Sequence, residues 1–465
     1  MPEQLPFPTI NSSLITKKSL TLKEHYKKNF TLAYPVMLSQ MGHVLVNLAD
    51  SVMVGQLGTI PLASVSLAFS VFSIVLLFGI GVSYGMTPLV AQADGEDDKQ
   101  RAVSILKHGL ILNTLFGVVL MLVTYGGGKL LVFMGQDQEV LDGTIPYLGL
   151  MAICMLPLMI FQSFRQFAEG LSFTKQSMII SISANVLNVV LNYILIFGKF
   201  GIEPMGLMGA GWATLISRVF MTVLMGGYII FSKRFAFYMV FFKAIETTKS
   251  VYRNILKIGI PSGVQYIFEV GAFSAAAIMI GWLGAVPLAA HQIAMNLSGV
   301  TYMMSTGIAA AATIRIGNQL GKKDIKTLRM AGFTCFVMAA IFMAFTGVGF
   351  IIGKDILPAY YIDDIEVIKY TSSLLVIAAI FQISDGVQAV GLGVLRGLSD
   401  VKIPTLITLL AFWGMSIPIG YVLGIKLGYG VQGVWVGLLI GLTVAGILHF
   451  LRFKALTKRL LNEGK

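Results

Sequence analysis

The stretch SVMVGQLGTIPLA (51–63) recurs as AIMIGWLGAVPLA (277–289), with seven identical residues at an offset of 226 positions. The same offset continues in both directions without a gap, so that residues 26–98 match residues 252–324. A fixed offset over a segment of this length indicates an internal duplication, and a repeat determines the architecture before any other feature does. We therefore expect two structurally equivalent halves.

Composition indicates the surroundings in which these halves fold. Of the 465 residues, 56% are hydrophobic and 12% are charged, and the mean hydropathy is +0.81. These values are typical of an integral membrane protein. Apolar runs recur, each close to the roughly 20 residues that a helix needs to cross a bilayer. Because the alternating segments of a β-barrel do not occur, we expect the spans to be helices.

Twelve such runs define the expected all-α fold. They lie at roughly 30–57, 61–92, 104–134, 140–168, 174–198, 206–231, 253–283, 287–318, 326–353, 366–396, 402–425 and 430–453. Six spans per copy is an even number, so both halves enter the membrane the same way round. We expect two six-helix lobes that are parallel repeats, related by an axis along the membrane normal, with a cleft between them.

The spans divide the chain into five parts. These are a cytoplasmic N-terminal segment (1–29), an N-lobe with spans one to six (30–231), a cytoplasmic interlobe linker (232–252), a C-lobe with spans seven to twelve (253–453) and a cytoplasmic tail (454–465). The linker mixes basic and aromatic residues, which suits a segment lying on the lipid headgroups of the cytoplasmic leaflet.

The basic residues predict the orientation. The chain has 34 Lys and Arg and a net charge of +12, but these residues lie between apolar runs, so we expect no nucleic-acid partner. With the N-terminus inside, five of the 34 fall in outer loops, at Lys129, Lys199, Lys354, Lys369 and Lys426. This asymmetry predicts that both termini are cytoplasmic and that the chain is a multi-pass protein of the inner (plasma) membrane.

The N-lobe contains an acid within an apolar span. A carboxylate there costs a few kcal/mol on insertion scales, which makes Asp50 a functional candidate. Asp50 shares a helix face with Asn47, whereas Asn188 and Asn192 form one stripe of the fifth span and Thr214 lies in the sixth. These neutral oxygen ligands suit a cation or a proton-carrying carboxyl group. Alternatively, the asparagines join helices through hydrogen bonds, as is common in membrane bundles.

The C-lobe contains two further acids. Glu269 lies in the seventh span one turn after Gln265, and Asp385 lies in the tenth span between Gln382 and Gln388. Two carboxylates that share a polar cavity repel one another unless a proton or a cation lies between them. Hard oxygen ligands suit Na⁺ or H⁺ better than a transition metal, so we expect a Na⁺ site at Glu269 and Asp385.

Structural roles are the alternative for several charged residues. Each of the C-lobe acids could pair with a distant arginine such as Arg315. At the inner ends of equivalent spans, two i,i+4 pairs are expected to form structural clamps, Arg165/Glu169 and Arg396/Asp400. We expect His291 to be a hydrogen-bonded core histidine, although it could also titrate near neutral pH.

The remaining residues indicate a binding cavity rather than a reaction centre. The 24 methionines and 30 phenylalanines mostly fill helix contacts, and some suit an adaptable apolar cavity. The possible cavity-lining residues are Asn47, Gln265, Phe273, His291, Phe381, Gln382 and Gln388. No Ser-His-Asp grouping, Cys/His metal spacing or GxxxxGK[ST] motif occurs where substrate could reach it. We therefore expect neither an enzyme nor a cofactor other than the coupling ion.

Several stretches together resemble multidrug and toxic compound extrusion (MATE) transporters of the NorM type. They are VNLADSVMVGQLG (46–58), FAEGLSFTKQSMI (167–179), LNVVLNYILIFGKFG (187–201), PSGVQYIFEVGAF (261–273), AAHQIAMN (289–296) and FQISDGVQAVGLGVLRGLSD (381–400). The resemblance covers nearly the whole chain. It implies two six-helix lobes in a V shape, and export of amphipathic organic cations in exchange for Na⁺ or H⁺.

The resemblance also implies roles for individual residues. Asp50, Asn188 and Asn192 correspond to the N-lobe site of that family, whereas Glu269 and Asp385 correspond to a C-lobe site that favours Na⁺ in NorM-type members. One position departs from the pattern, because relatives can carry Tyr four residues before the tenth-span Asp, where this chain has Phe381.

Other functions fit the sequence less well. A flippase for lipid-linked oligosaccharides, or a metabolite exporter, would use the same duplicated bundle, but a pyrophosphate-binding cleft would favour Arg and Lys over acids. An ion channel would show a filter loop or a small self-assembling subunit. We expect a monomeric efflux antiporter, with small amphipathic cations and membrane lipids as its partners.

Overall fold

The computed structural model describes residues 20–463, and this part of the chain is helical, without strands. Within it, eleven helices are long and apolar enough to cross a membrane. Helix α1 (Leu22–Gly55) is the twelfth long helix. Its His, Asn and Asp residues make it more polar than the other eleven. The expected all-α class with twelve long helices is confirmed, and the chain is a multi-pass membrane protein.

The helices follow the duplicated order. The first group consists of α1, α2 (Thr59–Ser83), α3 (Met86–Gly95), α4 (Lys99–Leu130), η1 (Leu131–Met134), α5 (Gln138–Gly170), α6 (Thr174–Phe197) and α7 (Gly206–Phe231). After the short α8 (Ala236–Phe242), the second group consists of α9 (Lys249–Gly281), α10 (Ala285–Gly321), α11 (Ile325–Gly353), η2 (Pro358–Tyr360), α12 (Ile365–Gly397), α13 (Lys402–Leu409), η3 (Leu410–Ser416), α14 (Ile417–Tyr421), η4 (Val422–Lys426) and α15 (Gly430–Glu463).

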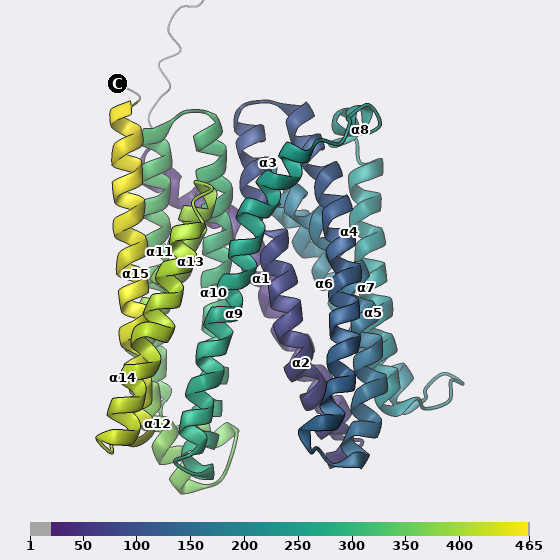
Figure 1. Ribbon diagram of the computed structural model, residues 1–465, viewed down its shortest axis with the longest axis vertical. Coiled ribbons are helices and arrows are strands. Elements are labelled where there is room, and N and C mark those ends of the chain that lie inside the picture. The colour runs from purple at the N-terminus through teal and green to yellow at the C-terminus, as the bar shows by residue number, and fades with distance from the viewer. Residues whose placement is uncertain (1–19, 464–465) are drawn as a thin grey trace, which may run out of the picture.

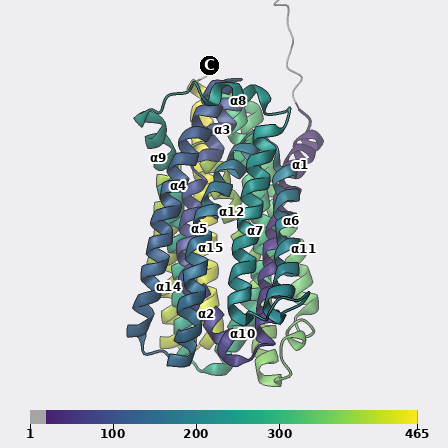
Figure 2. The ribbon, with the colours of Figure 1, turned by 90° about the vertical axis from the view of Figure 1, so that its right-hand side faces the viewer.

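The two groups form the two arms of a V. They lie close together at the end of the molecule that carries the C-terminus and α8, and they diverge toward the opposite end (Figure 1). Turned by 90°, the molecule is an upright bundle with α8 and the C-terminus at the same end (Figure 2). Helices α1, α2 and α3 of the first group contact α9 and α10 of the second. The expected V-shaped, two-lobed fold is confirmed.

Matched residues of the repeat occupy equivalent backbone positions. Gly58 and Gly284 stand before α2 and α10 with φ of +120° and +117°, a region that L-residues with a Cβ atom rarely adopt. Asp98 caps α4 by accepting a hydrogen bond from the backbone N–H of Arg101 at 2.8 Å, and Asp324 caps α11 in the same way. The duplication therefore preserves the glycine turns and the aspartate helix caps in both halves.

Some boundaries differ from those expected. α1 begins before residue 30 because Thr21 and Glu24 form a capping box. The second expected span is interrupted between α2 and α3, and the eleventh contains two π-helical segments on either side of Pro418. Proline lacks an N–H group and its ring clashes with the preceding turn, which accounts for the irregular winding there. α15 continues past residue 453 to Glu463.

Matched glycines bring the lobes into close contact beside α3. A Cβ atom on Gly95 would lie 2.1 Å from the carbonyl oxygen of Asn318, and one on Gly321 would lie 2.1 Å from that of Gln92. The Asn318 amide also donates to Asp94 at 2.6 Å across the same interface. At these two glycines the backbones of the lobes are in direct contact, and a side-chain hydrogen bond supports the contact beside them.

Candidate functional site

The N-lobe site joins α1, α6 and α7. The Nδ2 atom of Asn192 donates to Oδ1 of Asp50 and, at 3.2 Å, to Oδ1 of Asn188. Asn188 in turn donates to the Thr214 hydroxyl at 3.5 Å. Asn188 and Asn192 can both reach these partners because positions four residues apart lie on one helix face. The structure thus brings together the four residues that the sequence pattern grouped.

The surroundings of this cluster contain a cation and unpaired polar atoms. Arg218 interacts electrostatically with Asp50 while its guanidinium lies 5.1 Å from the centre of the Phe72 ring. Oδ1 of Asn192 is buried without a hydrogen-bond partner among the described residues. Asn47 does not join the cluster: it is exposed, and its carbonyl accepts from Ser51. An acid among neutral amide and hydroxyl groups can hold a proton or a small cation.

The C-lobe site centres on two acids that are each 5% exposed, Glu269 in α9 and Asp385 in α12. Tyr302 of α10 donates its hydroxyl to Oε1 of Glu269 at 3.2 Å, whereas Oε2 has no hydrogen-bond partner in the part of the chain that the structure describes. Asp385 interacts electrostatically with Glu269. Among residues 20–463, neither acid forms an ion pair. Two buried carboxylates that repel one another and form no ion pair are stabilised by a proton or a cation between them.

Amide side chains surround these acids with further oxygen atoms. Gln388 lies beside Glu269, and both of its polar atoms are buried without a hydrogen bond within the described chain. Gln382 accepts from the Thr346 hydroxyl at 3.0 Å, which leaves its own Nε2 without a partner. The unused oxygen of Gln388 beside a carboxylate without an ion pair fits the requirements of Na⁺, which prefers hard oxygen ligands. No group of three or more His, Cys, Asp and Glu is placed to bind a metal within residues 20–463.

A cluster of aromatic side chains lies next to the C-lobe acids. Phe381 is buried, and its ring centre lies 5.5 Å from that of Trp435 and 6.3 Å from that of Phe273. The Trp435 indole donates to Nδ1 of His291 at 3.1 Å. His291 is therefore a hydrogen-bonded core residue, as expected. Phe381 contributes packing but no oxygen, so the hydroxyl near these acids comes from Tyr302 instead.

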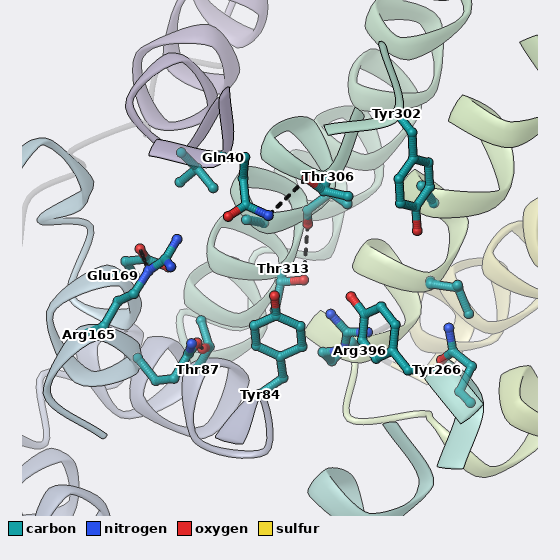
Figure 3. A pocket seen from close by; sticks show the side chains of 17 residues that line it. Gln40, Tyr84, Thr87, Arg165, Glu169, Tyr266, Tyr302, Thr306, Thr313 and Arg396 are labelled. Carbon is teal, nitrogen blue, oxygen red and sulfur yellow. Dashed lines mark hydrogen bonds and ion pairs between the residues drawn. The ribbon is translucent and has the colours of Figure 1, made fainter. Parts of the chain in front are cut away.

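A polar cavity lies between the lobes (Figure 3). Seventeen residues line it: Val36, Gln40, Tyr84, Thr87, Arg165, Gln166, Glu169, Gln265, Tyr266, Tyr302, Thr306, Ala309, Ala310, Thr313, Ala389, Leu392 and Arg396. They come from both groups of helices, so the cavity exists only while the lobes are together. Gln265, expected beside Glu269 in sequence, lines this cavity and is buried.

One of the two expected clamps is present and the other is not. Arg165 and Glu169 pair at 2.6 Å within α5. Asp400 pairs instead with Arg452 of α15, at 2.5 and 3.0 Å. The predicted Arg396/Asp400 pair was wrong because α12 ends at Gly397, so the i,i+4 relation of a continuous helix is lost before Asp400.

The alternative partner proposed for the C-lobe acids is also excluded. Arg315 is buried and donates to the carbonyl of His25 at 3.1 Å and to Oδ1 of Asn29 at 2.6 Å. These partners belong to the N-terminal part of α1. Arg315 therefore joins α1 to α10 and does not neutralise Glu269 or Asp385.

Sequence reasoning missed Tyr302. Its counterpart at the 226-residue offset is Leu76, so comparison of the two halves gave no indication of its role. The sequence feature that could have indicated its role is a phenolic hydroxyl within an expected membrane span, because a buried hydroxyl needs a hydrogen-bond partner. The cavity-lining residues Tyr84 and Tyr266 were missed for the same reason.

The fold and these buried acid sites define a two-lobed membrane protein of the transporter class. The chain belongs to the MatE family, whose model matches residues 35–194 and 261–422, one segment in each half. It is 32% identical to a probable multidrug resistance protein NorM of Agrobacterium fabrum, over 95% of this chain and 96% of that protein. It is 33% identical to multidrug resistance protein NorM of Photobacterium profundum, over 91% and 94% of the two chains.

Solved structures share the fold. The eukaryotic MATE transporter AtDTX14 matches with a TM-score of 0.84 at 22% identity, over 95% of this chain and 99% of that chain. An outward-facing multidrug resistance MATE family transporter matches with a TM-score of 0.86 at 22% identity, over 94% and 97%. These matches show that the two-lobed bundle extends over nearly all of the chain.

Proposed function

We propose that the protein is a multidrug efflux transporter that works as a secondary active antiporter. It exports amphipathic organic cations and other xenobiotics in exchange for inward Na⁺ or H⁺. The observation that carries the proposal is the pair of buried acids Glu269 and Asp385, neither of which forms an ion pair with a described residue. Membership of the MatE family and the multidrug resistance names of its relatives support the same function.

Na⁺ is the preferred coupling ion in this proposal. Glu269, Asp385 and the unpaired oxygen of Gln388 offer hard ligands, and Tyr302 holds Glu269 through its hydroxyl. When Na⁺ binds, it relieves the repulsion between the two carboxylates, and an exported cation competes for the same negative charge. Each of the two ligands therefore favours the conformation in which it binds more tightly.

The N-lobe cluster is a second coupling site in the proposal. Asp50 accepts from Asn192, and Asn188 and Thr214 extend this network. A single acid among neutral partners suits a proton or one cation. Asp50 would then couple export to H⁺ while the C-lobe pair responds to Na⁺.

The proposal includes an orientation and boundaries. We assign the N-lobe to residues 30–231 and the C-lobe to 253–453, with both termini and the linker in the cytoplasm of a cell with an inner membrane. In this orientation the described conformation diverges toward the outside (Figure 1). Each cation that enters releases about 2.3 kcal/mol per 100 mV of membrane potential, which drives export. The protein acts as a monomer in contact with lipid, and as a transporter rather than an enzyme.

Efflux of a fluorescent organic cation tests the proposal. Cells should expel the dye, and everted vesicles should accumulate it, when a Na⁺ gradient or a pH gradient is imposed separately. Glu269→Gln and Asp385→Asn should each abolish Na⁺-stimulated efflux while the protein remains inserted, because both keep hydrogen bonding but lose charge. Full Na⁺-stimulated transport in either variant would remove that residue from the coupling site.

A further inference from the structure

The interlobe cavity contains an arginine without an acid. Arg165 on one side of the cavity pairs with Glu169. Arg396 on the other side is 9% exposed and makes no hydrogen bond to any described residue, and its Nε atom is fully buried. Asp400, four residues further along the sequence, pairs with Arg452 instead. In the repeat, Arg396 occupies the position of Glu169, since GLS at 170–172 aligns with GLS at 397–399.

The residues around Arg396 do not neutralise it. Its guanidinium lies 4.8 Å from the centre of the Tyr84 ring, whose centre is 6.2 Å from that of Tyr266 (Figure 3). Glu269 interacts electrostatically with Arg396, but the two residues do not form an ion pair within the described chain, and Glu269 accepts a hydrogen bond from Tyr302. The charged residues that line the cavity are Arg165, Arg396 and Glu169. The cavity lining therefore has a net charge of +1.

The geometry points to a missing ligand. A buried ion without a partner costs several kcal/mol even after relaxation, whereas a cation–π contact returns about 0.5–2 kcal/mol. The Tyr84 ring covers one face of the guanidinium, but the N–H donors lie in the guanidinium plane. Nε is enclosed by protein atoms without an acceptor, whereas the edge that carries the two Nη groups is not enclosed, and these groups form no hydrogen bond with a described residue. An anion at this edge would form charge-assisted hydrogen bonds.

We propose that the interlobe cavity binds one small monovalent anion, an inorganic halide or a small carboxylate, on the free edge of Arg396. The Tyr266 hydroxyl and the Gln166 amide line the same cavity and offer additional donors, whereas the Thr87 hydroxyl already donates to Oε1 of Gln166. A single negative charge balances the lining. This site is distinct from the acids Glu269 and Asp385, which attract cations.

A bound anion also acts on conformation. Arg396 belongs to α12 of the second lobe, whereas Tyr84 and Thr87 belong to the first. An anion that binds only when both walls are present stabilises the state in which the lobes meet. The ligand therefore favours the conformation described here over one in which this end is open.

The thermal stability of the purified full-length protein tests the site. The melting temperature is measured in detergent at fixed pH, Na⁺ concentration and ionic strength, while sodium gluconate is replaced stepwise by sodium chloride or sodium acetate. We expect a saturable rise with at least one of the two small anions. A response to chloride alone identifies an inorganic ligand, and a response to acetate alone identifies a carboxylate. No saturable rise with either anion would overturn the proposal.

Variants locate the effect. Arg396→Gln should weaken the apparent affinity for the anion at least about tenfold, because a hydrogen bond to a charged group is lost. Arg459→Gln is the control, since Arg459 is exposed at the end of α15 and pairs with Glu463; it should respond as the unmodified protein does. An undiminished response in Arg396→Gln would refute the site.

A second variant keeps the proposal testable if Arg396→Gln does not fold. Arg396→Lys keeps the charge but loses the planar set of donors, so its apparent affinity should fall several-fold while the protein stays folded. An affinity equal to that of the unmodified protein would show that the anion binds elsewhere.

Discussion

Gly85 of the first lobe and Gly259 of the second meet backbone to backbone. A Cβ atom on Gly85 would lie 2.4 Å from the carbonyl oxygen of Ile255 and 2.9 Å from the nitrogen of Gly259. One turn away, a Cβ atom on Gly81 would lie 2.6 Å from the Cα atom of Gly263. Each lobe thus presents two glycines four residues apart, the spacing that lets membrane helices approach closely.

Gly85→Val should prevent this approach. The new side chain would meet backbone atoms, which cannot move aside, so the closed arrangement at this end is lost. We expect dye efflux to fall at least about tenfold, because a blocked conformation stops the transport cycle. Accessibility of the cavity is measured with Ala310→Cys, since Ala310 lines the interlobe cavity. In a background without Cys154 and Cys335, this cysteine should become reactive toward an impermeant maleimide added to everted vesicles.

Gly126→Val provides the matched control for this prediction, since a Cβ atom on Gly126 has no neighbour within 4 Å. It should be inserted, transport dye and resist labelling as the unmodified protein does. If Gly85→Val behaves in the same way as Gly126→Val, the backbone contact is not needed for transport.

Much of the fold followed from the repeat, because the duplicated residues have local physical roles. Gly58 and Gly284 turn the chain at equivalent positions, and Asp98 and Asp324 cap equivalent helices. The break between α2 and α3 was not predictable, nor was the π-helical form that the chain takes on either side of Pro418. They depend on how neighbouring helices pack around a local irregularity, and hydropathy does not report packing.

The candidate sites were predictable where one helix carried the pattern. Asn188 and Asn192 lie four residues apart, so their shared face was evident before the structure was known. The contact of Glu269 with Tyr302 and the separation of Arg396 from Asp400 depend on tertiary placement and on the residue at which α12 ends. Helix ends are the least reliable part of sequence interpretation.

Topology provides a separate prediction. Reporter tags after Lys465 and within residues 232–252 should both be cytoplasmic, because Lys and Arg are concentrated on that side. In Figure 1, α8 and the C-terminus lie at the same end of the bundle. A tag scan with alkaline phosphatase and green fluorescent protein measures this directly, and a periplasmic linker would contradict the orientation proposed for both lobes.

Tyr302→Phe should weaken coupling without removing it. The substitution deletes the hydroxyl that donates to Glu269 at 3.2 Å but keeps the ring. A hydrogen bond to a charged group contributes about 1.5–3 kcal/mol, so the Na⁺ concentration for half-maximal efflux should rise about tenfold or more. Tyr193→Phe, at an exposed position of α6, should leave it unchanged. An unaltered Na⁺ dependence in Tyr302→Phe would show that the hydroxyl does not support the ion site.

The Arg165/Glu169 pair should behave as a buried ion pair. Their side chains are 9% and 6% exposed, so removing one charge leaves the other uncompensated, at a cost of about 3–5 kcal/mol. Arg165→Gln and Glu169→Gln should each lower the melting temperature by several degrees, and the double variant should recover most of the loss. Additive losses in the double variant would mean that the two charges do not stabilise one another.

Asp50→Asn separates ion coupling from structural support in the N-lobe. The new amide still accepts from Asn192, and neutralising a buried carboxylate relieves its desolvation. Loss of the attraction to Arg218 acts in the opposite direction, so the melting temperature should be retained or slightly raised. Export should nevertheless fall at least about tenfold, because no titratable group remains in the cluster.

Both quantities are measured for Asp50→Asn on one purified sample, with transport assayed after reconstitution. Ser51→Ala is the control, because Ser51 is exposed beside Asp50 and bonds only to the Asn47 carbonyl within the described chain. If Asp50 is a structural anchor instead, its variant should lose melting temperature and yield together. An Asp50→Asn protein that is unstable but, once rescued by low temperature, exports at the unmodified rate would end the coupling hypothesis, since transport would then proceed without the carboxylate.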